Sequence, residues 1–533
     1  MLSLLKNLKV FAMLTAILFV LAACATPAQD PAGEAATGPA ETGTTEMPTP
    51  PTDGAEGGDL IWVTMADPQS LDPIRSSDAP STLVLSQMMD SLTRFDPITS
   101  ELRGHLAHDF YMLDDGTWVF HLRDGIYFHD GAYFTADAVV ANLNRALDPL
   151  EAAPQAFILD MIDEVIAVDT YTVHITTDFP FSPLPAHLTH RIAFMVSPDT
   201  LGGDVNVHPV GSGPFQFVEQ VHGDRIVMER FDNHWGQRAL PDTVTILTVP
   251  EPATRWAMLY TGDAHAMQGL PADYAEAQAV PHLDVFFLQA SSSDYIGFNT
   301  YNHPYLSNVR VRQAISMAIN RQDILTYLRY DLGIIADSPL PPFVAHAPQR
   351  VDSLPYDPVR AREILEEEGL GDGFTLSFWY NTGNAFRAQV AEYVQANLAD
   401  IGITIEILGM EWSAYLEATG AGQHDMFILG WVVVTGDADY GVFPLFHTDQ
   451  MGDPGNRSFY SNPVVDDLLE RGRMSSDPAE RDAIYLEIAE ILAYDVPKLF
   501  LQFTGHPYVT NGIDGLVVDF AITPYFYNVS FRN

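Results

Sequence analysis

The sequence predicts an α/β protein with two or more domains. Its 533 residues are 47% hydrophobic and 11% aromatic, so the chain can bury a large core and exceeds the usual length of a single domain. Strand-like and helix-like segments alternate along it, and no short repeat recurs. This alternation favours an α/β body over a solenoid.

The first clear elements lie between residues 117 and 147. "TWVFHLRDGIYF", Thr117 to Phe128, alternates apolar and polar residues between the turn sequences "DGT" and "HDG". This pattern predicts a hairpin-rich edge of a sheet. "TADAVVANLNRAL", Thr135 to Leu147, starts with a threonine suited to an N-cap and then places apolar residues at helical spacing, which predicts a helix.

Three further segments have the apolar spacing of amphipathic helices: Val309 to Leu328, Asp357 to Gly369 and Phe386 to Gly402. The last two end at glycine, which accepts the left-handed conformation that often closes a helix. Each of the three is expected to lay one face on a core.

The third helix is flanked by the strand-like segments "FTLSFWY" and "ITIEILGM", so a β-α-β unit is predicted over Phe374 to Met410. Ligands of such units gather at the carboxyl ends of the strands. This places the polar loop "YNTGNAFR" over a cleft, with Asn381, Asn384 and Arg387 as candidate ligand-binding residues.

The N-terminus reads as a secretion signal over residues 1–23. Lys6 and Lys9 precede an almost unbroken apolar run, and small residues close it. The sequence "LAAC" then resembles the lipobox of bacterial lipoproteins, in which the cysteine becomes the lipidated first residue. Cys24 is the only cysteine of the chain, so no disulfide can form within it. Residues 24–59, rich in Pro, Gly, Thr, Ala and Glu, are predicted to be a disordered, lipidated tether.

The charge balance excludes several classes of partner. Without the two signal lysines the chain has 24 bases against 70 acids, a balance of −46. Nucleic acid and anionic membrane surfaces repel such a protein. No apolar run of about 18 or more residues follows the signal, so the membrane is expected to hold the protein through the lipid anchor only.

Catalytic and metal motifs are scarce in the body. It has no cysteine, "VGSGPF" lacks the first glycine of a nucleophile elbow, and no Walker A loop occurs. Two His-x-x-His pairs, His105/His108 and His187/His190, lack the glutamate of a zincin motif, which favours structural or surface histidines. We therefore expect no catalytic residue, no cofactor and no metal.

The stretch "GWVVVTGDADYGVFPLF", Gly430 to Phe446, allows several interpretations. A strand-like run leads into Asp437 and Asp439, followed by Tyr440. The two carboxylates could act as a general acid and base. The turn formers around them also fit a solvated turn. A ligand-facing loop is the interpretation favoured here.

Several segments agree with a known family in order and spacing. They include "WVFHLRDGIYFHDGAYFTADAVVANLNRAL", "HPVGSGPFQFVE", "IGFNTYNHPYLSNVRVRQAISMAINRQDIL", "VQANLADIGITIEILGMEWSAYL" and "GNRSFYSNPVVDDLLERGR". From about Leu60 to the C-terminus the chain thus resembles the extracytoplasmic solute-binding proteins, family 5, of peptide-type ABC transporters.

The resemblance implies the large, three-subdomain type of the two-lobed periplasmic-binding-protein fold, with a hinge and an interlobe ligand cleft. Lobe one would be residues 60–294 plus 505–533, with an inserted subdomain at about 104–208. Lobe two would be residues 295–504.

The resemblance also suggests where the ligand binds. In peptide-binding relatives an aspartate three residues beyond the Gly-Trp pair receives the ammonium group, but here Trp431 plus three is Val434. Either Asp437, Asp439 and Tyr440 take over ligand contact, with Asp437 favoured as the partner of an ammonium group, or the ligand lacks a free amine at that end. The cleft residues expected from this reasoning are Trp431, Thr435, Asp437, Asp439, Tyr440, Asn381, Asn384 and Arg387.

The expected function is that of a monomeric, lipid-anchored receptor on the periplasmic side or outer face of the cell membrane. It would capture a peptide or peptide-like molecule by lobe closure and deliver it to ABC permease subunits with their ATPases. Three alternatives stay open: another small solute such as an oligosaccharide or a metal chelate, a pheromone or sensory lipoprotein, and a hydrolase that uses Asp437 and Asp439.

Overall fold

The described residues all belong to one compact unit. The computed structural model describes residues 57–76, 78–269, 271–301, 303–349, 351–452 and 455–532. The predicted signal peptide, the lipidation site Cys24 and nearly all of the predicted tether lie outside these residues.

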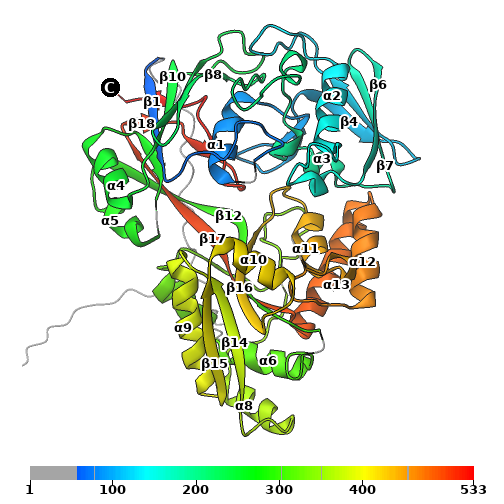
Figure 1. Cartoon of the computed structure of the whole chain (residues 1–533), viewed down its shortest axis with the longest axis vertical. Coiled ribbons are helices and arrows are strands. Elements are labelled where there is room, and N and C mark those ends of the chain that lie inside the picture. The colour runs from blue at the N-terminus through cyan, green and yellow to red at the C-terminus, as the bar shows by residue number, and fades with distance from the viewer. Residues whose placement is uncertain are drawn as a thin grey trace, which may run out of the picture. The chain divides into compact units, whose positions relative to one another are not determined.

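A sheet of eleven strands forms the centre of the unit (Figure 1). Ten strands follow one another in the order β15-β14-β16-β12-β17-β11-β1-β10-β9-β8, and β13 pairs with β17 off this path. The bounds are β1 Asp59–Thr64, β8 Phe215–Val221, β9 Arg225–Arg230, β10 Thr243–Thr248, β11 Ala266–Gln268, β12 Leu283–Phe298, β13 Gly333–Ile335, β14 Phe374–Asn381, β15 Ile403–Met410, β16 Met426–Val432 and β17 Lys498–Asn511.

The long strands β12 and β17 lie side by side and join the two halves of this sheet (Figure 1). Their antiparallel register shifts between Gln289 and Ser293 and again between Asp294 and Tyr295. Asp294 accepts a hydrogen bond from the side chain of Gln502 across the pair, at 3.2 Å. The lobe boundaries expected at 294/295 and 504/505 fall inside these two strands and stay a prediction.

A second sheet of four strands lies within the segment expected to be an inserted subdomain. Its order is β4-β5-β7-β6, with helix α2 packed against it. The predicted strand at 117–128 is confirmed only for β5, and β5 lies inside this sheet, between β4 and β7, rather than at its edge. The bounds are β4 Ala107–Met112, β5 Trp118–Leu122, α2 Ala136–Leu147, β6 Ile162–Asp169 and β7 Thr172–Thr177.

The predicted β-α-β unit is confirmed. Strands β14 and β15 pair in parallel, and helix α9, Ala385–Ala399, connects them. Helix α8, Pro358–Glu367, also forms where the sequence predicts it. Gly369 and Gly402 follow the two helices with φ of +76° and +91°, as expected of glycines that close helices.

The helix expected at 309–328 is interrupted. Helix α6, Val309–Ala318, ends before Ile319, and a short helix α7, Arg321–Asp323, leads into a π-helical turn, Ile324–Leu328. The side chain of Asn320 accepts hydrogen bonds from the backbone N–H groups of Gln322 and Asp323, so it caps a new helix. Amphipathic spacing does not reveal such a break, because both pieces keep their apolar faces inward.

The other helices and short strands complete the unit: α1 Ala79–Met88, α3 Leu184–His187, α4 Pro252–Thr261, α5 Tyr274–Gln278, α10 Trp412–Gly420, α11 Ala438–Phe446, α12 Pro463–Met474, α13 Pro478–Asp495, β2 Thr93–Phe95, β3 Leu102–Gly104, β18 Ile513–Asp514, β19 Val517–Val518, β20 Pro524–Tyr525 and β21 Ser530–Phe531. Among the described helices, none has both the length and the apolar composition that crossing a bilayer requires.

One core links distant parts of the chain. The apolar cluster of the four-stranded sheet includes Tyr440 of α11, and Trp431 and Val434 pack against it. The backbone N–H of Ser182 also donates to the carbonyl of Arg473 in α12, at 3.1 Å. These contacts hold the end of β16 and the start of α11 against residues 179–195, which is where the cavity described next is found.

Candidate ligand cavity

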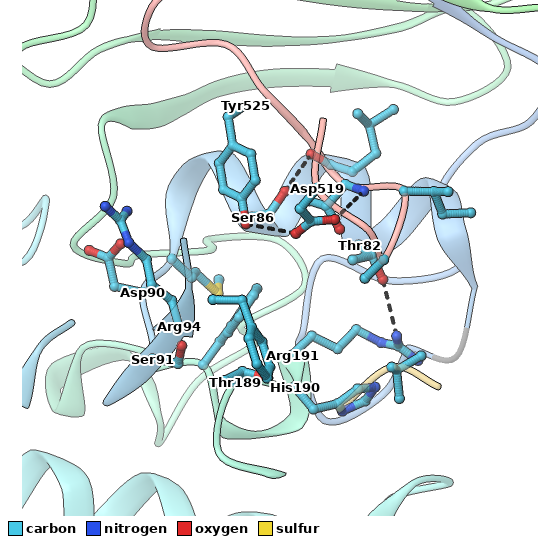
Figure 2. Close-up of a pocket in the computed structure, with 18 of the residues that line it drawn as sticks. Thr82, Ser86, Asp90, Ser91, Arg94, Thr189, His190, Arg191, Asp519 and Tyr525 are labelled. Carbon is cyan, nitrogen blue, oxygen red and sulfur yellow. Dashed lines mark hydrogen bonds between the residues drawn. The ribbon is translucent and has the colours of Figure 1, made fainter. Parts of the chain in front are cut away.

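A cavity of about 510 Å³ lies where four segments of the chain meet. Its walls come from residues 78–95, 189–194, 430–434 with Tyr440, and 519–527, with smaller contributions from His105, Gln155, Pro214 and residues 234–237. Figure 2 shows several of its lining side chains. The volume falls in the range of about 300–1,000 Å³ that is usual for sites of small organic ligands.

Trp431 and Tyr440 form an aromatic wall of the cavity. The indole Nε1 of Trp431 donates to the backbone carbonyl of Tyr440 at 3.0 Å, and the two rings stack with centroids 5.3 Å apart. The strand β16 ends at Val432 and the chain returns through α11, which brings these two residues together. Both lie where the sequence places a ligand wall, and their contact with a ligand stays a prediction.

Asp437 does not lie on the cavity wall, contrary to the expectation from the sequence. It is the N-cap of α11 and accepts two hydrogen bonds from Arg481 of α13, at 2.6 and 2.8 Å. Both side chains are buried. Burial alone would raise the pKa of Asp437, but the charge and hydrogen bonds of Arg481 outweigh it and hold that pKa below its ordinary value. The carboxylate thus already has its cation.

Thr435 and Asp439 are also buried away from the cavity lining. Asp439 lies 3.3 Å from Nε of Arg473 and 3.7 Å from Nε2 of His187. The hydroxyl oxygen of Thr435 accepts a hydrogen bond from the backbone N–H of Asp437, at 3.4 Å. The interpretation of this stretch as a solvated turn is therefore wrong, because the turn is packed between α13 and the core of the four-stranded sheet.

Asn381, Asn384 and Arg387 form one polar cluster at the carboxyl end of β14, as the β-α-β pattern predicts. Arg387 donates to the side-chain oxygen of Asn381 at 2.6 Å, and Asn384 caps α9 by accepting from the backbone N–H of Arg387 at 3.1 Å. The cluster does not line the cavity. Its Arg387 lies beside Gly430, a lining residue, because a Cβ atom added at Gly430 would be 3.6 Å from Nη2 of Arg387.

The His-x-x-His pairs have structural contacts. His105 makes a hydrogen bond of 2.8 Å with Asp90, and His187 Nδ1 makes one of 2.8 Å with the carbonyl of Ile158. His108 stacks on His121. Within the described residues, no cluster of three or more His, Cys, Asp or Glu side chains has the arrangement of a metal site.

His190 and Arg191 are lining residues that sequence reasoning did not assign to ligand binding. A short 3₁₀ turn, Arg191–Ala193, follows His190, and the backbone N–H of Ile192 donates to Nδ1 of His190 at 3.3 Å. Nδ1 is therefore the acceptor, and Nε2 carries the proton of the neutral ring. The guanidinium of Arg191 donates to Ser76 and to Gln155. It also donates to the hydroxyl of Thr82, as Figure 2 shows.

Asp519 is a second lining residue without a sequence assignment. It follows β19 in a tight turn and accepts hydrogen bonds of 2.9 Å from the backbone N–H of Thr523 and from the hydroxyl of Tyr525 (Figure 2). Its burial raises its pKa to about 6, and these hydrogen bonds offset only part of that effect. One sequence signal could have indicated it: an aspartate stands inside the apolar run "LVVDF". Aspartate is rarely buried among apolar residues unless it has a partner.

The fold and the ligand-sized cavity are those of a binding protein for a small ligand, and comparison with known families agrees. Residues 101–453 match the model of the bacterial extracellular solute-binding proteins, family 5 Middle. The chain belongs to family 5 of the bacterial extracellular solute-binding proteins.

Individual relatives are more specific. The glutathione-binding protein GsiB of Pectobacterium atrosepticum is 34% identical over 447 residues, which cover 81% of this chain and 86% of that protein. GsiB of Escherichia coli strain K12 is 33% identical over 455 residues, covering 82% and 88%.

Solved structures share the fold. The periplasmic binding protein DppA from Helicobacter pylori, in complex with the peptide STSA, has a TM-score of 0.78 at 27% identity and covers 90% of this chain and 99% of that one. HbpA2 from Haemophilus parasuis has a TM-score of 0.81 at 24% identity and covers 89% and 100%. The fold is therefore the two-lobed periplasmic-binding-protein fold that the sequence predicts.

Proposed function

We propose that this protein captures a peptide or peptide-like solute outside the cytoplasmic membrane and delivers it to an ABC permease, whose ATPase subunits supply the energy. The observation that carries the proposal is the cavity itself: a ligand-sized space with an aromatic wall, Trp431 and Tyr440, in a chain of family 5. The similarity to a glutathione-binding protein and to a binding protein solved with the peptide STSA supports this class of ligand.

The proposed mechanism is closure of two lobes on the ligand. Residues 60–294 with 505–533 would move against 295–504 by bending β12 and β17, where the register shifts beside Asp294. Ligand contacts made only in the closed form shift the population toward it, and the permease would recognise that form. In this role the protein binds its solute without altering it.

Binding is tested by calorimetric titration of the full-length chain, purified in detergent, with glutathione and a panel of di- to pentapeptides. We expect at least one of these probes to saturate a single site and to be recovered chemically intact. Absence of binding by the whole panel contradicts the proposed ligand class. Recovery of cleaved peptide contradicts the non-enzymatic role and favours the alternative function of a hydrolase.

Trp431→Ala is expected to weaken binding of the best probe of this panel by at least ~1 kcal/mol, because buried aromatic anchors commonly contribute that much. Trp412→Ala serves as the matched control, since Trp412 is 44% exposed on α10 and does not line the cavity. Equal affinities for wild type and a folded Trp431→Ala variant, by calorimetry, would remove Trp431 from the ligand site.

We also propose that Cys24 carries the lipid that anchors the protein. The support is the position of the only thiol at the end of the signal-like segment. Cys24→Ser is expected to move the protein from the membrane fraction to the soluble fraction of the cell envelope or to the medium, with unchanged thermal unfolding. A variant that stays in the membrane fraction contradicts the anchor.

A further inference from the structure

Two buried groups on the cavity wall carry unit charges that no described residue neutralises. Asp519 is 7% exposed, and no described Arg, Lys or His nitrogen lies within ion-pair distance of it. Arg191 is also 7% exposed, and no described carboxylate lies within ion-pair distance of its guanidinium. A buried charge without a counter-ion is costly, so each group favours a partner from outside the chain.

Asp519 has room for such a partner. A carboxylate offers about four acceptor positions, and Asp519 accepts from the backbone of Thr523 and Ala521 and from the hydroxyl of Tyr525, which leaves one position open. All three donors are neutral, so the negative charge remains. Asp90 lines the same cavity but is different, because Ser212, Trp235 and His105 surround its two oxygens. Asp78 also lines the cavity, but it is less buried and both of its oxygens accept hydrogen bonds, from Ser81 and the backbone of Gln69. Asp519 is therefore the buried lining carboxylate that is ready to accept a cation.

His190 and Arg191 form the complementary group. Nε2 of His190 is buried without a hydrogen-bond partner among the described residues, and it carries the ring proton. The Nη1 atom of Arg191 has two N–H groups, of which one donates to Thr82. Asp78 acts on Arg191 electrostatically but forms no ion pair with it. His190 and Arg191 thus each keep one N–H group that can donate to a ligand. The positive charge of Arg191 favours an anionic acceptor.

We infer that the cavity holds its ligand by charge at two places, with an ammonium group on Asp519 and a carboxylate on the pair His190 and Arg191. The ligand class is therefore a small zwitterionic peptide with a free amine and a free carboxylate, in which Asp519 takes the role that the sequence assigned to Asp437. Arg94, half-buried on β2 at the cavity, adds a second guanidinium without an ion pair among the described residues.

The inference rests on the proposed function and names the ligand chemistry of the same cavity. The test uses one mixture of glutathione and di- to pentapeptides in three forms: unmodified, N-acetylated, and methyl-esterified at the carboxylates. Full-length wild-type protein in detergent is incubated with each form, and captured peptides are released and quantified by mass spectrometry. Asp519→Asn is compared with Asp514→Asn, which removes a carboxylate from the same C-terminal segment but outside the cavity lining.

Wild type and Asp514→Asn are expected to capture unmodified peptides at least about tenfold better than either modified form, because a stranded member of a desolvated charge pair costs more than this factor. Asp519→Asn is expected to lose the preference over acetylated peptides and to keep the preference over esters. His190→Phe, which keeps a flat ring but removes the Nε2 donor, is expected to narrow only the preference over esters.

Two outcomes overturn the inference and are distinct. If wild type captures acetylated and unmodified peptides equally, or if Asp519→Asn keeps the wild-type preference, the amine site is not Asp519, while peptide binding stands. If wild type captures nothing from any mixture, the proposed function itself fails and the inference fails with it. The ester and acetyl comparisons use wild type alone, so they decide whether the ligand's amine and carboxylate are recognised even where a variant does not fold.

Discussion

Asp437→Asn is expected to lower the free energy of unfolding by about 3–5 kcal/mol, which is the usual cost of leaving one member of a buried ion pair without its partner. The substitution removes the negative charge that faces Arg481 and leaves that guanidinium buried, at 5% exposure, next to Tyr485. The amide also weakens the cap of α11, although it can still accept one hydrogen bond. Chemical denaturation at pH 7 measures the change.

The matched control is Asp482→Asn, because Asp482 neighbours Arg481 in sequence but its side chain is 66% exposed. It is expected to change the unfolding free energy by less than about 1 kcal/mol. Since the pKa of Asp437 lies below its ordinary value, its stabilising effect is present above the unfolded pKa and is lost as pH falls through the folded one. The difference from wild type should therefore shrink in acid. A stable variant with weakened peptide binding would instead restore Asp437 as a ligand contact.

Asp519→Asn is expected to act in the opposite direction and to stabilise the ligand-free protein at pH 8 by up to about 3 kcal/mol. Burial raises the pKa of Asp519 from 3.8 to about 6, and each unit corresponds to ~1.36 kcal/mol. A raised folded pKa contributes stability below the unfolded pKa, and this contribution is lost as pH rises through about 6. Wild type therefore carries the cost of a buried charge at pH 8, and the asparagine variant does not.

The pH dependence of stability distinguishes the removal of a buried charge from a general improvement in packing. The titratable groups that act on Asp519 are the phenols of Tyr525 and Tyr508, whose pKa values burial raises well above 10, so neither changes charge between pH 4 and 8. Stability curves of the two ligand-free proteins should converge below about pH 4 and separate through pH 6. Curves that stay parallel across this range, or a variant less stable than wild type at pH 8, contradict an unpaired charge at Asp519.

The sequence predicts the regular elements well where local patterns determine them. Helix α2 and the β14-α9-β15 unit form at the expected positions because apolar spacing and glycine ends are local signals. Helix α11 has no such signal: Gly441 and Pro444 lie within it and are typical of loops. It forms because its residues are buried against the surrounding core, an effect of tertiary packing that local propensity does not contain.

The site was less predictable for a related reason. Asp437 and Arg481 are 44 residues apart, so nothing near Asp437 in the sequence indicates that its charge is already neutralised. Conversely, Asp519 and Arg191 belong to segments more than 300 residues apart that meet only in the folded cavity. Resemblance to the family could predict that Trp431 belongs to the aromatic wall. It could not predict charged lining residues that lie at positions outside the family's motif.

The most direct single measurement is a calorimetric titration of the full-length wild-type protein with the peptide that it captures best, repeated with the same peptide acetylated at its amine. We expect one saturable site for the free peptide and an affinity at least about tenfold weaker for the acetylated form. Equal affinities would contradict recognition of the amine by Asp519, and the absence of any saturable binding would contradict a peptide receptor altogether.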